Sequence, residues 1–163
     1  MLGQASGYAA AALGYIASAG GSPMLVKEVA HACAIPGPYL AKIVNTLRRV
    51  GLVQTQRGVG GGVTLARDAR EITLLQVCEL MGDAIVKKRC MLGTEECSEE
   101  RACPTHEFWT AHRKDMIAFL KRTTIADLAA FEANRRARSL RSPTGEAFGE
   151  PRAPSRAGLD RVR

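Results

Sequence analysis

The sequence predicts a mostly α-helical protein with a small β-hairpin, built as a winged helix-turn-helix domain plus a long dimerisation helix. Two helical patterns, 25–33 and 39–50, are joined by a Pro/Gly turn, and a hairpin pattern with a glycine-rich tip follows them directly. Helix, turn, helix and hairpin in this order make a winged helix-turn-helix. A long amphipathic helical pattern later in the chain supplies the second part of the prediction.

The predicted DNA-binding domain covers residues 1–82 and begins with three helices. The first lies in the alanine-rich stretch 7–19, which a Gly-Gly-Ser-Pro sequence ends. The second covers 25–33, where apolar residues recur at helical spacing until a Pro-Gly-Pro sequence breaks the pattern. The third resumes the same spacing over 39–50, and Gly51 follows as its C-terminal cap.

The predicted hairpin, or wing, follows the third helix. Its strands are 52–56 and 63–65, and the glycine-rich loop 57–62 joins them. The loop matches neither the G-x-x-x-x-G-K-[ST] phosphate loop nor G-x-G-x-x-G before a helix, so we expect no nucleotide binding. After the wing, a capping-box sequence from Thr73 to Gln76 predicts a helix that continues to about Met81.

Polar and mostly basic side chains on one face of the 39–50 helix predict contacts with double-stranded DNA. Lys42, Arg48 and Arg49 suit phosphates, and Asn45 can address a base edge. Arg57 opens the wing tip, from which a side chain can reach along the duplex or into a minor groove. The glycines that follow let the backbone approach DNA closely. The alternative is a purely structural helix pair with a solvated polar face.

Potential metal ligands gather in the predicted second region, residues 83–106. Cys90, Cys97, Cys103 and His106 lie within 17 residues of a chain that has only five cysteines and three histidines. Thiolates and imidazoles are the ligands of iron–sulfur clusters and of zinc. The spacings of six, five and two residues do not match paired C-x-x-C knuckles. Three interpretations remain open: an iron–sulfur cluster, a zinc site, or free thiols.

The other two cysteines are expected in the core. Cys33 ends the apolar stripe of the 25–33 helix, and Cys78 lies on the apolar face of the helix that begins near Thr73. An odd number of cysteines, three of them clustered, argues for a reducing cytoplasm and a metal site rather than for a disulfide framework.

A long helix is predicted at the start of the third region, residues 107–134. It spans 107–121, and a new cap near Thr123 restarts the helix. A helix this long on a small domain needs a surface that buries its apolar side. Packing against a second copy, giving a homodimer, would also match palindromic half-sites in DNA.

Charge and composition exclude several classes of function. The net charge is +7, and residues 135–163 contribute much of it, with eight arginines against three acids. We predict that this arginine-rich tail is disordered. A basic chain favours a polyanionic partner. No run of 18 apolar residues exists, so no membrane partner is expected. The sequence has no pair of carboxylates and no nucleophile–base signature that would indicate an enzyme.

These motifs together resemble the IscR/NsrR family of dimeric winged-helix repressors. The resemblance extends from about Tyr8 to Phe131. Its anchors in the DNA-binding domain are Tyr39 and Leu40 at the start of the third helix and the sequences 47–53 and 57–62. Its anchors after that domain are the Cys-Pro-Thr-His run from Cys103 to His106 and the tryptophan that follows it, Trp109. With the resemblance, the predicted DNA-binding set is Tyr39, Lys42, Asn45, Arg48, Arg49, Arg57, Gly60 and Gly61.

The resemblance implies that an iron–sulfur cluster beside the dimerisation helix tunes DNA affinity. In the IscR type, three cysteines and a histidine hold a [2Fe–2S] cluster, which assigns Cys90, Cys97, Cys103 and His106. Some NsrR types hold [4Fe–4S] with an aspartate from the partner's first helix. This chain has Gly7 at that position, which favours [2Fe–2S] over [4Fe–4S].

Two departures from the family pattern limit what carries over. The first two cysteines are separated by six residues instead of the five of the IscR type. The recognition helix has Ala41 where the IscR type has a glutamate thought to discriminate between operator classes, so the target sequence does not carry over.

Overall fold

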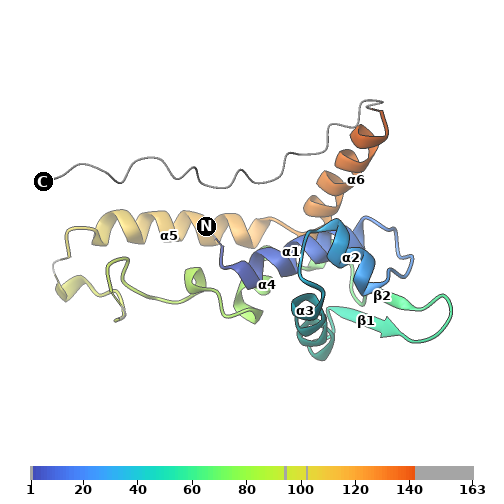
Figure 1. Ribbon diagram of the computed structural model, residues 1–163. Helices are drawn as coiled ribbons and strands as arrows, with labels where there is room; N and C mark the ends of the chain where they lie inside the picture. The colour runs from blue at the N-terminus through green and yellow to red at the C-terminus, as the bar shows by residue number, and fades with distance from the viewer. Residues whose placement is uncertain (1, 94, 102, 142–163) are drawn as a thin grey trace, which may run out of the picture.

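A computed structural model describes residues 2–93, 95–101 and 103–141 (Figure 1). Its first half is the predicted winged helix-turn-helix, so the predicted fold class is confirmed. Within the described residues, no helix is long and apolar enough to cross a membrane. The elements of this half are α1 (Gln4–Ala17), α2 (Val26–Ala32), α3 (Gly37–Arg49), β1 (Val53–Gln56), β2 (Gly62–Leu65) and α4 (Leu74–Leu80).

Two of the predicted helices begin earlier than expected. Helix α1 starts at Gln4, and its first turn includes a hydrogen bond from the Gly7 N–H to the Gly3 carbonyl oxygen. Helix α3 starts at Gly37 because Pro38, expected to interrupt the chain, sits in the first helical turn. A proline there loses no intrahelical hydrogen bond, and its fixed φ suits the helix.

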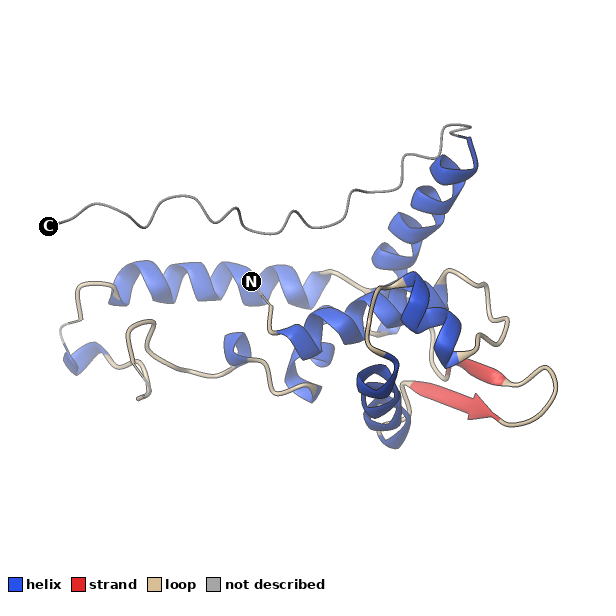
Figure 2. Cartoon of the chain, in the orientation of Figure 1, coloured by secondary structure: helices blue, strands red, loops and turns tan. Residues whose placement is uncertain are grey.

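The two strands form an antiparallel hairpin, shown in red in Figure 2, with Val53 paired to Leu65 and Gln56 to Gly62. Gly51 takes a φ of +71° between α3 and β1, a conformation that favours glycine. The hairpin buries Val63 in the same core as Leu13, so α1 and the wing share one apolar centre.

Helix α4 closes the domain as its capping sequence predicts. The Thr73 hydroxyl accepts a hydrogen bond from the Gln76 N–H at 3.2 Å, and the Gln76 side-chain oxygen accepts one from the Thr73 N–H at 3.1 Å. Cys78, on the same helix, is 1% exposed and is confirmed as a core residue. Cys33 is only half-buried at the edge of the core, with its sulfur 3.8 Å from the Ala11 carbonyl oxygen.

The second half of the chain is dominated by two helices, α5 (His106–Arg122) and α6 (Ile125–Arg141). Figure 1 shows α5 extending away from the winged domain, with the loop that precedes it running alongside. The predicted restart is confirmed: the Asp127 carboxylate accepts a hydrogen bond from the Thr124 N–H at 2.7 Å at the start of α6. Helix α6 then packs against α1 of the winged domain.

The arginine-rich tail does not begin at residue 135 as predicted, because 135–141 are helical. Arginine is a good helix former, and Arg135 pairs with Glu132 one turn earlier at 2.8 Å. The Arg136 guanidinium also lies 3.9 Å from the centre of the Tyr15 ring on α1. The remainder of the predicted disordered tail, 142–163, lies outside the described residues.

Gly14→Ala is expected to destabilise the protein because α1 and α6 touch at this glycine. A Cβ at Gly14 would lie 2.9 Å from the Leu128 Cβ, so one helix must shift. Forcing an extra methyl group into such a contact costs about 1–3 kcal/mol, which thermal unfolding would detect as a lower Tm. The matched control is Gly7→Ala on the same helix, where a Cβ meets nothing within 4 Å. That change should raise stability by roughly 0.5–1 kcal/mol; equal effects of the two substitutions would contradict the α1–α6 contact.

Candidate metal centre and nucleic-acid interface

The segment between α4 and α5 folds back on itself and brings distant ligands together. It carries two short 3-10 helices, η2 (Ala84–Val86) and η3 (Glu99–Arg101). Between them, Arg89 pairs with Glu96 in an antiparallel bridge. The Cys90 N–H donates to the Glu95 carbonyl oxygen at 3.0 Å, and the Cys97 N–H to the Lys88 carbonyl oxygen at 3.3 Å. These bonds place Cys90 and Cys97 on neighbouring segments of one loop.

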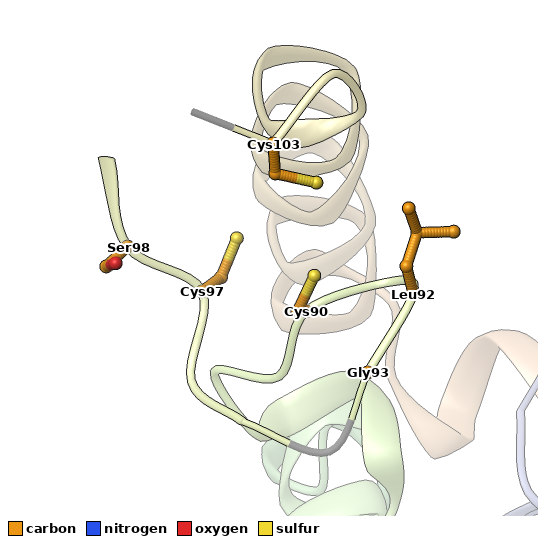
Figure 3. A pocket seen from close by; sticks show the side chains of 6 residues that line it. All are labelled: Cys90, Leu92, Gly93, Cys97, Ser98 and Cys103. Atoms are coloured by element: carbon orange, nitrogen blue, oxygen red, sulfur yellow. The ribbon is translucent and has the colours of Figure 1, made fainter. Parts of the chain in front are cut away.

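The structure places the three predicted cysteine ligands around one pocket and the predicted histidine ligand beside one of them. Cys90, Cys97 and Cys103 line one open pocket of about 200 Å³, into which Figure 3 shows their sulfurs pointing. His106, the first residue of α5, completes the set, with its Nδ1 3.2 Å from the Cys97 sulfur. The Cys103 sulfur lies 3.3 Å from the Thr105 hydroxyl oxygen.

The donor set of three thiols and one imidazole matches the ligand chemistry of an iron–sulfur cluster and of a single zinc ion. Thiolates with one imidazole are a known ligand combination for either. A tetrahedral zinc ion needs four donor atoms within about 2.0–2.3 Å of one point. Among the described residues, no three His, Cys, Asp or Glu side chains converge closely enough to hold one metal ion.

Helix α5 holds the cysteine loop through two side chains. The Trp109 indole N–H donates to the Arg89 carbonyl oxygen at 2.8 Å. The Arg113 guanidinium donates to the carbonyl oxygens of Ile85 and Val86 at 3.1 and 2.9 Å. Sequence reasoning identified Trp109 but missed Arg113, whose partners lie 27 and 28 residues away. These three hydrogen bonds join the loop directly to α5.

A buried aspartate ties the start of the loop to α1, and nothing in the sequence pattern indicated it. Asp83 is 6% exposed, and its carboxylate accepts hydrogen bonds from the N–H groups of Gly3 and Ile85 at 2.7 and 3.1 Å. Burial alone would raise the pKa of this carboxyl, but its hydrogen bonds with Ser6, Ile85 and Gly3 outweigh burial and lower the pKa. Burial and the Asp83 charge together raise the pKa of the nearby Cys78 thiol to about 11.

Asp83→Asn is expected to lower the stability of the fold near neutral pH. It should also make that stability less sensitive to acid pH. Because the folded-state pKa of Asp83 lies below its ordinary value of 3.8, its stabilisation is present above that value. It is lost as the pH falls further, through the folded-state pKa. The substitution should cost about 1–3 kcal/mol at pH 7, and the difference from the unmodified chain should shrink below about pH 4. Urea unfolding at several pH values measures this, with the exposed Asp115→Asn as control; a pH-independent difference would contradict the charge's role.

The predicted DNA-contacting side chains of α3 share its exposed face. Lys42, Asn45, Arg48 and Arg49 are exposed, whereas the other face of α3 is buried in the core. Tyr39, at the start of the helix, stands edge-on to Tyr8 of α1, with ring centres 5.7 Å apart. Figure 2 shows the hairpin beside α3. Helix α3 therefore has its basic side exposed and its first turn in contact with α1.

The wing tip is exposed at Arg57 and Gly60, but Gly61 is buried. Gly60 has a φ of +75°, which favours glycine. A Cβ on Gly61 would lie 2.9 Å from the Gly58 carbonyl oxygen, so this position admits only glycine. Of the predicted DNA-binding set, Gly61 thus shapes the tip, while Arg57 and Gly60 face solvent.

Comparison with known proteins identifies the family. Residues 2–130 match the Rrf2 family, which is described as an iron-dependent transcriptional regulator. The chain belongs to the Rrf2 family. It is therefore a DNA-binding transcriptional regulator and not an enzyme, as the sequence predicted, and the predicted resemblance is confirmed at the level of this family.

Curated relatives of this Rrf2-family chain include named regulators. An HTH-type transcriptional regulator of Aquifex aeolicus is 36% identical over 127 residues, which are 77% of this chain and 88% of the relative. The regulator IscR of Serratia proteamaculans is 32% identical over 106 residues, or 65% of this chain and 64% of IscR. The match thus spans slightly under two thirds of the length of IscR.

Solved structures share the Rrf2 fold. CymR of Bacillus subtilis, described as its global cysteine regulator, superposes with a TM-score of 0.64 at 24% identity, covering 80% of this chain and 97% of CymR. IscR of T. potens gives a TM-score of 0.61 at 23% identity, covering 89% and 93%. At these identities the likeness shows the fold alone.

Proposed function

We propose that this Rrf2-family chain is a homodimeric repressor whose affinity for a double-stranded DNA operator is tuned by an iron–sulfur cluster, [2Fe–2S] in preference to [4Fe–4S]. The ligands would be Cys90, Cys97, Cys103 and His106. The observation that carries the proposal is the pocket into which three sulfurs from one loop point, with His106 beside Cys97. An imidazole in place of one thiolate would give the cluster a higher reduction potential and a protonatable ligand.

The chain's own contacts offer a route from the pocket to the DNA-binding face. Trp109 joins the cysteine loop to α5, and Asp83 joins the start of the loop to the first turn of α1. Tyr8, on the next turn of α1, touches Tyr39 at the start of the recognition helix. A loop conformation that changes with the state of the site can therefore bias α1 and α3. A coupling of about 1–3 kcal/mol would change DNA occupancy ~5–150-fold.

The exposed side chains of helix α5 support the proposal of a homodimer. Of its 17 residues only Leu120 is buried, while Phe108 and Phe119 are 64% and 43% exposed. Exposed aromatic side chains on a long helix are typical of a surface that another protein covers. A second copy packing along α5 would bury them and set the spacing of two recognition helices on palindromic half-sites.

A second candidate function is thiol-based regulation without a cluster, with zinc or no metal. CymR of Staphylococcus aureus, whose oxidized form has been solved, is 24% identical to this chain and superposes with a TM-score of 0.62. The half-exposed Cys90 and Cys97 would supply accessible thiols that an oxidant could reach.

Anaerobic purification of the full chain tests these two functions against each other. Visible absorption is recorded together with iron, sulfide and zinc content. Iron and sulfide in near-equal amounts with visible bands would support the cluster, and the iron count per chain would separate [2Fe–2S] from [4Fe–4S]. A colourless protein that stays metal-free or carries zinc after reconstitution would overturn the cluster and favour the thiol function.

A further inference from the structure

A second pocket, of about 220 Å³, shares Cys97 with the cysteine pocket but differs from it in chemistry. It lies between the loop and α5, and three basic residues are among those that line it: Lys88, Arg89 and Arg113. Glu99 is its only carboxylate. Among the described residues no ion pair joins Glu99 to any of the three cations. The lining therefore carries a net positive charge that no direct pairing neutralises.

Hydrogen bonds to the backbone hold two side chains of this second pocket in place. The Arg113 guanidinium uses its Nε and one Nη to bind the carbonyl oxygens of Ile85 and Val86. A guanidinium has five N–H donors, so further donors remain. Trp109 is fixed by its bond to the Arg89 carbonyl oxygen. A site whose side chains are already held loses little conformational freedom on binding.

We propose that this second pocket binds a small oxyanion, such as phosphate, sulfate or the carboxylate of a small acid. Guanidinium and ammonium groups form charge-assisted hydrogen bonds with such oxygens, and the Thr110 hydroxyl adds a further donor. The volume is below the roughly 300–1,000 Å³ of pockets that hold drug-sized ligands, so the ligand is small.

The oxyanion site contacts two of the proposed cluster ligands, Cys97 and His106, which also line it. Resting on the proposed function, this contact makes anion binding and cluster binding energetically linked. The linkage is reciprocal: an anion that binds the cluster-loaded form less tightly also weakens cluster binding by the same factor.

Intrinsic fluorescence tests the site directly, because Trp109 lines it and is the only tryptophan in the chain. Full-length protein without cluster is titrated with sodium phosphate, with ionic strength held constant by sodium chloride. We expect a saturable change in fluorescence. In the double variant Lys88→Gln/Arg89→Gln the dissociation constant should rise at least ~tenfold, because two charge-assisted contacts are lost. Both substitutions leave the backbone bonds of these residues to Cys97 and Trp109 in place.

Lys114→Gln, an exposed charge on α5 outside the pocket, is the matched control and should bind phosphate like the unmodified chain. Parallel titrations with sodium sulfate and sodium acetate distinguish a tetrahedral oxyanion from a carboxylate. A linear response to all three salts, or equal affinity in the double variant, would overturn the site. Because no cluster is present, either result leaves the iron and sulfide measurements to decide the proposed function separately. Repeating the titration on reconstituted protein tests the linkage. Equal phosphate affinities of the cluster-free and the reconstituted protein would refute it.

Discussion

Cys97→Ala is expected to abolish the visible absorption of the reconstituted protein and its bound iron and sulfide. Cys97 is the central ligand of the proposed set, because it lines the cysteine pocket and lies 3.2 Å from His106. Alanine cannot coordinate a metal, and with three ligands left the cluster should not survive purification. The measurement is iron, sulfide and visible absorption after anaerobic reconstitution, compared at equal protein concentration.

Two neighbouring substitutions make this result specific to coordination. Ser98→Ala changes the next residue in the same pocket, and Cys33→Ala removes a thiol outside the loop. Both should keep full iron and sulfide content. If Cys97→Ala kept them too, the ligand assignment would be wrong. A different result would support the thiol function. In that case the unmodified chain would bind no iron, oxidants would change its DNA affinity, and Cys97→Ala would remove this effect of oxidants.

The local elements of the fold could be predicted because each depends on nearby residues. The capping box at Thr73 and Gln76 involves side chains three residues apart, and the structure shows both of its hydrogen bonds. The spacing of apolar residues in 39–50 gives α3 its buried face, and the glycines of 57–62 mark the turn of the wing. Such signals require no knowledge of the rest of the chain.

The contacts that connect the site to the fold could not be predicted in this way. Asp83 meets Gly3 across 80 residues, and Arg113 meets Ile85 across 28. An aspartate in a loop and an arginine on a helix are most often solvated, and only the tertiary arrangement gives them these distant partners. The helical residues 135–141 were missed for the same reason, because composition alone does not reveal the packing of Arg136 on Tyr15.

Arg57→Ala is expected to weaken DNA binding by similar factors for an operator and for unrelated sequence. Arg57 is exposed at the wing tip, directly before Gly58. An arginine that contacts phosphate contributes to affinity but carries no sequence information. Its loss should reduce the slope of log affinity against log salt concentration by about one, measured by fluorescence anisotropy over a series of salt concentrations.

Two further substitutions separate phosphate contact from base contact and from net charge. Asn45→Ala, on the exposed face of α3, should cost about 1–3 kcal/mol on the operator and little on unrelated DNA, because it removes a base-edge contact. Arg67→Ala is the control for net charge, because it also removes one positive charge. Arg67 lies just after the wing and pairs with Glu71 at 3.6 Å. This change should leave the salt slope unchanged. If Arg57→Ala behaved like Arg67→Ala, the wing would not touch the duplex, and recognition would rest on α3 alone.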